Sequence, residues 1–164
     1  MFKFSIIVII IASISLGILI YPNFSHKMSY KNANKTIDVK YEETDFKISN
    51  NQIRERIEKL VGVKVYWYSE ESQRDNTGAS NLYFRRVIMD NTITQSDYIE
   101  TFCHELLHLK YFTKNERFVN YKTFVTLYES EFKQVAINMA WEMQNGKVER
   151  EYNCLAQICD YLAQ

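Results

Sequence analysis

The chain has 164 residues, a length that suits one domain. Apolar residues make up 46% and charged residues 24% of the chain, as in an ordinary globular protein. Lys+Arg and Asp+Glu both total 20, so the formal net charge is zero and the basic excess that marks nucleic-acid-binding proteins is missing. We therefore expect one folded domain and no nucleic-acid partner.

The amino-terminal segment contains an uncharged, isoleucine-rich run, SIIVIIIASISLGILIY, which follows Lys3 and ends before Pro22. Its length, roughly 17 residues, is at the short end of the range for a helix that spans a membrane. A cleaved signal peptide is the alternative, but the residues after the run, Tyr-Pro-Asn-Phe, match a cleavage site poorly. We favour a transmembrane anchor over residues 1–22, and a secreted form that has lost this segment stays open.

Residues 23–48 are polar, rich in Lys, Asn and Ser, and show no sustained hydrophobic period. They predict a polar tether between the membrane and the domain. Lysines are more numerous after the apolar run than before it, with Lys27, Lys31, Lys35 and Lys40 on one side and Lys3 on the other. Because lysine and arginine are enriched on the cytoplasmic side of spanning helices, this distribution favours a single-pass membrane protein with a cytoplasmic domain.

The folded domain is expected over residues 49–164, and its first half reads as a helix followed by two strands. Ile53, Ile57 and Leu60 recur at helical spacing after a cap at Asn50 or Asn51, and Gly62 ends that helix. Residues 63–68 (VKVYWY) predict a strand, and residues 69–80 predict a polar loop that contains Gly78. Residues 81–90 (NLYFRRVIMD) predict a second strand, whose expected inward residues are Leu82, Phe84, Val87 and Met89.

The second half of the domain reads as helices. Thr94 and Asp97 predict the start of a helix that runs from about Ser96 to Phe112. Its apolar side is formed by Ile99, Phe102, Cys103, Leu106 and Leu109. A loop around Asn115, a long helix over residues 121–144 and a last helix over residues 147–162 follow. The predicted fold class is therefore α+β, with a small β-sheet packed on a helical half.

His104-Glu105-Leu106-Leu107-His108 has the pattern His-Glu-x-x-His and uses two of the three histidines. Residues four apart on a helix lie on the same face, so the two imidazoles can bind one metal ion, for which Zn²⁺ is the expected choice. Glu105 then lies beside the metal, where its carboxylate can take a proton from a bound water. The pattern indicates a zinc-dependent hydrolase of peptide bonds with His104 and His108 as ligands and Glu105 as the general base.

A catalytic zinc site needs a third protein ligand. His26 lies in the tether and is a poor candidate, and the histidine spacing of one zincin class is excluded because Tyr111 and Lys114 occupy the corresponding positions. The downstream carboxylates remain, namely Glu116, Glu129, Glu131 and Glu142. On the predicted helix over residues 121–144, Glu129 and Glu131 lie at opposite edges of the apolar face, and helical geometry does not separate them. Glu116 falls in the predicted loop, which is a less rigid platform.

From about Val63 to Ala140 the chain resembles the ImmA/IrrE family of metallopeptidases. The resemblance rests on the order of Gly78, the strand NLYFRRVIMD, the motif HELLH and the run Glu131-Phe132-Lys133-Gln134-Val135-Ala136. In that family a glutamate on the helix after the motif, in a Glu-Ala-x-x-Phe-Ala-like pattern, is the third ligand. The resemblance therefore implies a gluzincin in which Glu131 binds the metal, with Glu129 in reserve, and which cleaves a protein such as a regulator. Leu107 and Phe132 stand where the family usually has glycine and alanine.

These patterns together predict a membrane-anchored zinc metallopeptidase that hydrolyses a peptide bond in a protein or peptide substrate. A catalytically inactive zinc-binding interaction module of the same fold is the alternative. A structural zinc site closes the fourth coordination position with a protein ligand and has no use for Glu105. The motif therefore favours the enzyme.

Overall fold

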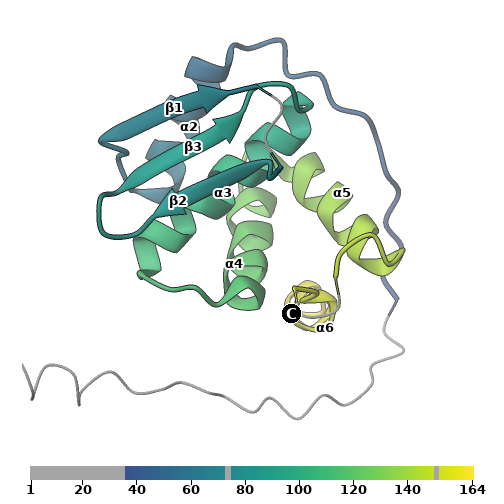
Figure 1. The fold of residues 1–164 in the computed structure, drawn as a ribbon. Helices are drawn as coiled ribbons and strands as arrows, with labels where there is room; N and C mark the ends of the chain where they lie inside the picture. The colour runs from purple at the N-terminus through teal and green to yellow at the C-terminus, as the bar shows by residue number, and fades with distance from the viewer. Residues whose placement is uncertain (1–35, 73–74, 150–151) are drawn as a thin grey trace, which may run out of the picture. The chain divides into compact units, whose positions relative to one another are not determined.

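The computed structural model describes residues 36–72, 75–149 and 152–164 (Figure 1). Five helices and three strands follow one another in these segments: α2 (Asn50–Val61), β1 (Trp67–Glu71), β2 (Gly78–Asn81), β3 (Arg86–Asp90), α3 (Gln95–Tyr111), α4 (Glu116–Tyr128), α5 (Lys133–Gln144) and α6 (Leu155–Leu162). The α+β class predicted from the sequence is confirmed.

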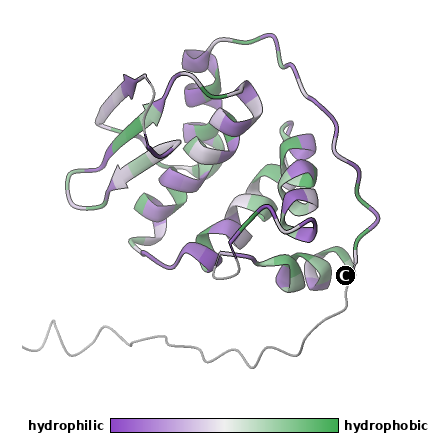
Figure 2. Cartoon of the chain, turned by 45° about the vertical axis from the view of Figure 1, so that its right-hand side comes forward, coloured by the Kyte–Doolittle hydropathy of each residue, from purple (hydrophilic) through white to green (hydrophobic). Residues whose placement is uncertain are grey.

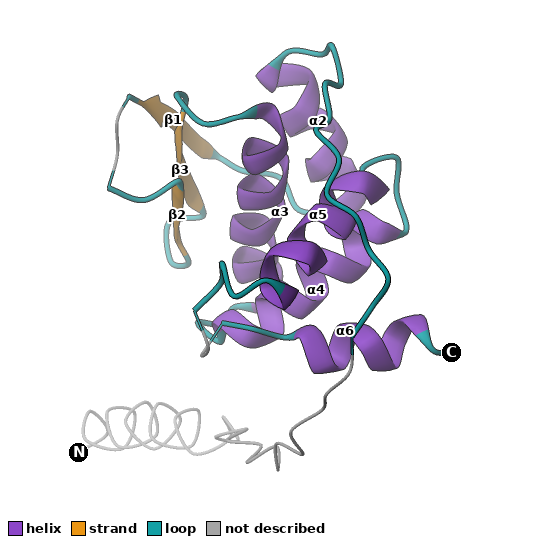
Figure 3. Ribbon diagram, turned by 90° about the vertical axis from the view of Figure 1, so that its right-hand side faces the viewer, coloured by secondary structure: helices purple, strands orange, loops and turns teal. Residues whose placement is uncertain are grey.

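The sheet is small and mixed, with the strand order β1-β3-β2. The central strand β3 runs parallel to β1 and antiparallel to β2, so β2 is an edge strand within the described part of the chain. Val87 and Met89 of β3 are fully buried, as predicted. Figure 3 shows the sheet on one side of α3 and helices α4 and α5 on the other side. Helix α3 is therefore the layer that joins the sheet to the helical half.

The strands differ from the predicted ones because a turn divides the second of them. Asn81 ends β2, and its side-chain oxygen accepts hydrogen bonds from the backbone N–H groups of Tyr83 and Phe84 at 3.1 Å each. Arg85 then takes a left-handed φ of 48°, which reverses the chain before β3. Phe84, which was predicted to face inward, is exposed for this reason, and Leu82 is half-buried.

Strand β1 begins later than predicted, at Trp67. Val63 and Val65 are buried, but they belong to the connection after α2. The backbone N–H of Val65 donates to the Glu58 side chain at 3.0 Å instead of to a neighbouring strand. The alternating apolar pattern therefore marked residues that enter the core without pairing in the sheet.

The long helix predicted over residues 121–144 is two helices. Helix α4 begins at Glu116, because the side chain of Asn115 caps it by accepting the backbone N–H of Phe118 at 3.0 Å. The Ser130 hydroxyl donates to the carbonyl of Leu127 and accepts the N–H of Phe132, at 2.8 and 3.0 Å. These side-chain bonds compete with the helical backbone bonds, and the chain breaks between α4 and α5.

Residues 36–48, predicted as the end of the tether, lie extended along the helices (Figure 3). The Asn138 side chain accepts the N–H of Glu42 at 3.0 Å and donates to the carbonyl of the same residue at 2.7 Å. Gln95 binds the main chain of Phe46 and Ile48 in a similar way, at 2.9 and 2.6 Å. With Gln144, whose side-chain oxygen accepts the N–H of Ile37 at 2.8 Å, three side-chain amides thus hold the backbone of this segment on the domain.

Hydrophobic residues of α3 form the centre of the core, and α6, whose residues are largely hydrophobic (Figure 2), packs against α4 and α5. Ile158 and Cys159 are the buried residues of α6. Across the described segments, none of the helices combines the length and the apolar character that crossing a bilayer requires. The predicted anchor over residues 1–22 lies outside the described residues.

Candidate metal centre

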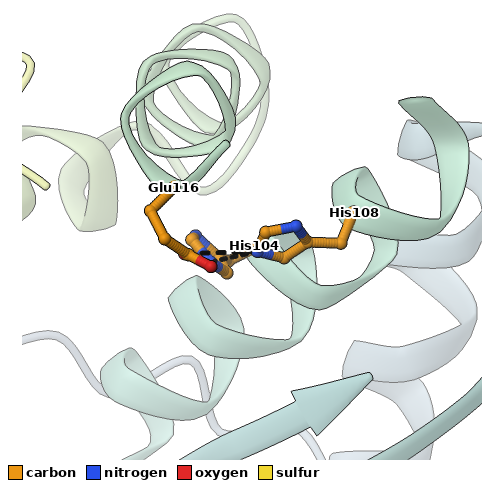
Figure 4. Close-up of side chains that lie close together, drawn as sticks. All are labelled: His104, His108 and Glu116. Carbon is orange, nitrogen blue, oxygen red and sulfur yellow. Dashed lines mark hydrogen bonds and ion pairs between the residues drawn. The ribbon is translucent and has the colours of Figure 1, made fainter. Parts of the chain in front are cut away.

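Helix α3 positions the two motif histidines. Thr94 caps the helix by accepting the backbone N–H of Asp97 at 3.1 Å, as the sequence predicts. The predicted apolar side of α3 is buried throughout: Ile99, Phe102, Cys103, Leu106 and Leu109. His104 and His108 lie one turn apart beside this stripe and point toward the start of α4 (Figure 4). Their side chains are 17% and 8% exposed.

A short connection places Glu116 against these histidines. Phe112 ends α3 in the left-handed conformation, with a φ of 48°, and Asn115 already caps α4. Glu116 is therefore the first residue of a helix that begins directly over the histidines. Its Oε2 lies 3.0 Å from Nε2 of His104 and 3.3 Å from Nε2 of His108, and the two Nε2 atoms are 2.9 Å apart (Figure 4).

The three donor atoms fit one divalent cation. His104, His108 and Glu116 each offer one ligand atom, and these atoms lie within 4.8 Å of one another. A tetrahedral Zn²⁺ with ligand bonds of about 2.0–2.1 Å would separate its ligand atoms by about 3.3 Å. The observed separations of 2.9–3.3 Å are close to that value. Two imidazoles and one carboxylate suit zinc, and they also suit other transition metals.

The orientation of His108 is fixed by the backbone of the α3–α4 connection. Its Nδ1 lies 2.7 Å from the carbonyl oxygen of Thr113. A carbonyl can only accept a hydrogen bond, so Nδ1 carries the proton and donates it. In the neutral ring the lone pair is then on Nε2, which faces His104 and Glu116. A backbone carbonyl in this role is a usual way to orient a metal-binding imidazole.

The surroundings of the site shift the pKa values of His104 and Glu116 in opposite directions. Burial lowers the pKa of His104, but the hydrogen bond to Glu116 and the negative charges of Glu105, Glu116 and Glu100 outweigh burial, so the pKa is raised. The hydrogen bond from His104 and the charge of His108 hold the pKa of Glu116 below its usual value, against the effect of burial. Glu116 is therefore an anionic donor at neutral pH.

Glu105, the predicted general base, is 9% exposed and lines a pocket of about 270 Å³. The pocket lies between β2, α3 and the start of α4, and its lining includes His108 and Glu116. The other lining residues are Ala79, Ser80, Leu82, Thr113 and Lys114. Gly78 lets β2 approach α3 here, since a Cβ at this position would lie 2.5 Å from Cγ2 of Thr101.

The two glutamates chosen from the sequence as third ligand are not in this group. Glu131 forms an ion pair with Arg56 at 2.5 Å, and both side chains are about half exposed, at 55% and 43%. Oε1 of Glu129 accepts a hydrogen bond from the Tyr161 hydroxyl at 2.5 Å. Helix α4 has 13 residues, about 20 Å at 1.5 Å per residue, and it separates these glutamates from Glu116 at its other end.

The sequence contains a signal that could have identified Glu116. Asn115 is a preferred N-cap residue, an acidic residue follows it, and apolar Phe118 and Val119 begin the helical period. This pattern predicts that a helix starts at Glu116, and the structure has a helix there in place of the expected loop. The family resemblance implies Glu131 as the third ligand, whereas the carboxylate that lies beside the two histidines in the structure is that of Glu116.

Comparisons of the chain with protein-family models, curated proteins and solved structures give no match. The resemblance to the ImmA/IrrE family therefore stays a prediction from the sequence. The chemistry of the site is therefore the basis for proposing a function.

Proposed function

We propose that this protein is a zinc-dependent peptidase in which His104, His108 and Glu116 hold the metal and Glu105 is the general base. The observation that carries the proposal is the convergence of these three ligand atoms beside a pocket that Glu105 also lines. A structural zinc site would need neither the pocket nor the acid.

A bound zinc ion supplies Lewis acidity and lowers the pKa of a coordinated water to about 7. Glu105 follows His104 directly on α3, and its carboxylate is buried at the pocket wall. In the proposed reaction it accepts the proton of the attacking water and passes it to the leaving amine. His108 keeps its orientation during this transfer, because its Nδ1–H is held by the Thr113 carbonyl.

The pocket supports an extended peptide as substrate. Ala79 and Ser80 of β2 line it, and the outer edge of β2 has no partner strand within the described residues. An extended chain can add to such an edge through main-chain hydrogen bonds and so run past Glu105. Lys114, also in the lining, places a positive charge where a peptide carbonyl or an acidic side chain would lie.

The proposed location rests on the sequence alone. We propose that residues 1–22 anchor the protein in a membrane, since the apolar run is uncharged and its carboxyl end matches a cleavage site poorly. Amino-terminal sequencing of the protein purified from cells tests this: an intact Met1 or Phe2 supports an anchor, and a new terminus near residue 22 shows cleavage.

The function is tested with the full chain and the variant Glu105→Gln. Metal content is measured by inductively coupled plasma mass spectrometry, and peptide hydrolysis is measured by mass spectrometry on a peptide library digested from denatured proteins. We expect about one zinc ion per chain in both proteins, and hydrolysis by the wild type only. A variant that hydrolyses peptides at the wild-type rate would exclude Glu105 as the base. A wild type that binds zinc and cleaves nothing would favour the interaction module.

A further inference from the structure

One end of the sheet exposes an unusual number of aromatic side chains. Tyr66 is 70% exposed, Trp67 68%, Tyr83 81%, Phe84 71% and Phe112 50%. They come from three separate segments: the start of β1, the β2–β3 turn and the end of α3. Single exposed aromatic residues need no explanation, but a cluster from three elements is typical of an interaction surface.

Ring contacts and strand pairing bring these residues together at one end of the sheet, with residues 83–86 as the segment that the pairs share. The rings of Tyr83 and Phe112 pack edge to face with centroids 5.7 Å apart. The guanidinium of Arg85 lies over the Tyr66 ring, 5.6 Å from its centroid. Trp67 is paired with Arg86 in the register of β1 and β3. We call Tyr66, Trp67, Tyr83, Phe84, Arg85, Arg86 and Phe112 the aromatic–basic face.

The charge of this face is one-sided. Arg85 and Arg86 are both exposed, and Lys64 and Lys114 flank the face in sequence, also exposed. The segments 64–68 (KVYWY), 81–86 (NLYFRR) and 110–114 (KYFTK) contain five basic residues and no acidic one. The whole chain, in contrast, has a formal net charge of zero. The positive charge is therefore concentrated where the exposed aromatic rings are.

We propose that the aromatic–basic face docks on the surface of an anionic phospholipid bilayer. Tyrosine and tryptophan partition to the headgroup region, where their rings meet the acyl boundary and their polar edges stay hydrated. Arginine and lysine beside them are attracted to anionic headgroups, each by about 1 kcal/mol near the surface, which is about five-fold in binding. The apolar run within residues 1–22 would hold the domain near such a surface.

Docking through this face has a consequence for the substrate. Leu82, in the same turn as Tyr83, and Lys114, two residues after Phe112, both line the pocket beside Glu105. The pocket therefore opens next to the docked surface. This consequence rests on the proposed function: the substrate would be a peptide segment that lies close to the membrane, such as the region flanking a spanning helix.

The two tryptophans of the chain give a matched test. Trp67 belongs to the aromatic–basic face, whereas Trp141 is half-buried on α5 against Tyr41, with ring centroids 5.4 Å apart. The full chain is reconstituted into phosphatidylcholine vesicles with or without phosphatidylglycerol, each containing phosphatidylcholine brominated near the headgroup. Fluorescence quenching by the bromolipid is compared between wild type, Trp67→Phe and Trp141→Phe.

We expect the bromolipid to quench the fluorescence of wild type and of Trp141→Phe, and not that of Trp67→Phe. Because Trp67 is exposed, its substitution should leave the fold intact. The quenching should need phosphatidylglycerol, weaken with added salt, and fall several-fold in the double variant Arg85→Ser, Arg86→Ser. Equal quenching of both tryptophans, no quenching, or quenching that ignores phosphatidylglycerol would overturn the proposal. A third outcome would also overturn the proposal: Trp67 fluorescence that is protected from quenching by aqueous iodide but is not quenched by bromolipid. In that case a protein, and not the bilayer, would cover the face.

None of these measurements depends on metal or on hydrolysis. A failure of the docking proposal therefore leaves the proposed peptidase activity untouched, and an inactive protein could still dock.

Discussion

The two ends of α4 carry the same kind of residue in opposite surroundings. At the amino end, Glu116 lies 3.0 and 3.3 Å from the two histidines of α3 and lines a pocket. At the carboxyl end, Glu131 forms a half-exposed ion pair with Arg56. Each glutamate comes a few residues after the end of a helix: Glu116 follows α3, and Glu131 follows α4. Only the first is placed against other potential ligands.

The difference lies in how firmly the surrounding structure positions each carboxylate. The α3–α4 connection is held by Asn115, by the carbonyl of Thr113 and by the left-handed Phe112, so Glu116 has a defined position over α3. An exposed ion pair such as that of Glu131 is worth about 0–1 kcal/mol and fixes little. We therefore propose Glu116 as the third ligand, because its side chain is held beside the two histidines, whereas the position of Glu131 along the sequence alone does not bring it near them.

The largest expected effect separates the two glutamates by metal affinity. Glu116→Gln removes an anionic donor from the site and should lower zinc affinity by more than the roughly 10–100-fold that loss of a residue hydrogen-bonded to a ligand causes. Glu131→Gln should leave zinc affinity unchanged and change the free energy of unfolding by less than about 1 kcal/mol. Isothermal titration with a competing chelator measures both. Equal affinity losses would contradict the assignment.

The sheet side of the metal centre can be disturbed without touching a ligand. Gly78→Ala would place a Cβ 2.5 Å from Thr101 Cγ2 and 3.0 Å from Met89 Sδ. We expect a loss of about 1–3 kcal/mol of unfolding free energy, because β2 must move away from α3. Gly62→Ala is the control: it has open space around it and a φ of 75°, so it should cost only the left-handed backbone strain, about 1–2 kcal/mol.

Urea unfolding of the two glycine variants measures these costs. Hydrolysis adds a second readout, since Gly78→Ala should also lower the turnover rate whereas Gly62→Ala should not. If the two variants lose activity equally, the approach of β2 to Glu105 has no role in catalysis.

Glu100, an acidic residue close to the candidate metal centre, should make the stability of the protein depend on pH. Glu100 lies one turn before His104, and burial with the charges of Glu142 and Asp97 raises its pKa to about 7, against the opposing charge of His104. Because the folded value exceeds the ordinary value of 4.5, the contribution of Glu100 to stability is greatest below pH 4.5 and is lost as the pH rises through 7.

Glu100→Gln should remove this loss. We expect the variant to gain on the order of 1–2 kcal/mol over wild type between pH 5 and pH 8. Urea unfolding across that pH range, in the presence of a chelator, gives the difference. A difference between the two proteins that does not change with pH would contradict a raised pKa.

The smallest expected effects come from the residues that shape the two ends of α4, Asn115 and Ser130. Asn115→Ala removes the cap of α4 and should cost about 1 kcal/mol of stability. Ser130→Ala removes the hydroxyl that binds Leu127 and Phe132 and should cost a similar amount, about 0.5–1.5 kcal/mol. Only Asn115→Ala should also weaken zinc binding, because only it loosens Glu116. Weaker zinc binding in Ser130→Ala would show that the two ends of α4 are coupled.

Local chemistry predicted the parts of the fold that have strong sequence signals. Helix α3 begins after Thr94 and helix α2 ends before Gly62, both as expected. The two motif histidines share a face because they are four residues apart. Strand β2 was missed because Gly78, Ala79 and Ser80 lack the β-branched and aromatic residues typical of strands, and its position depends on close packing against Thr101.

The third ligand could not be chosen by helical periodicity, because the assumed helix does not exist as one element. The hydrogen bonds of Ser130, which divide the assumed helix, are local side-chain bonds, and the ion pair between Glu131 and Arg56 is a tertiary contact. Neither leaves a periodic signal in the sequence. The cap at Asn115 was readable, but a cap shows where a helix starts and not what its first residue faces.

Anomalous diffraction at the zinc edge, from crystals of the full chain grown with zinc, tests the central claim most directly. The account predicts one peak about 2.0–2.2 Å from Nε2 of His104, Nε2 of His108 and a carboxylate oxygen of Glu116. A peak that involves Glu131 instead of Glu116, or no peak between the two histidines, would contradict it.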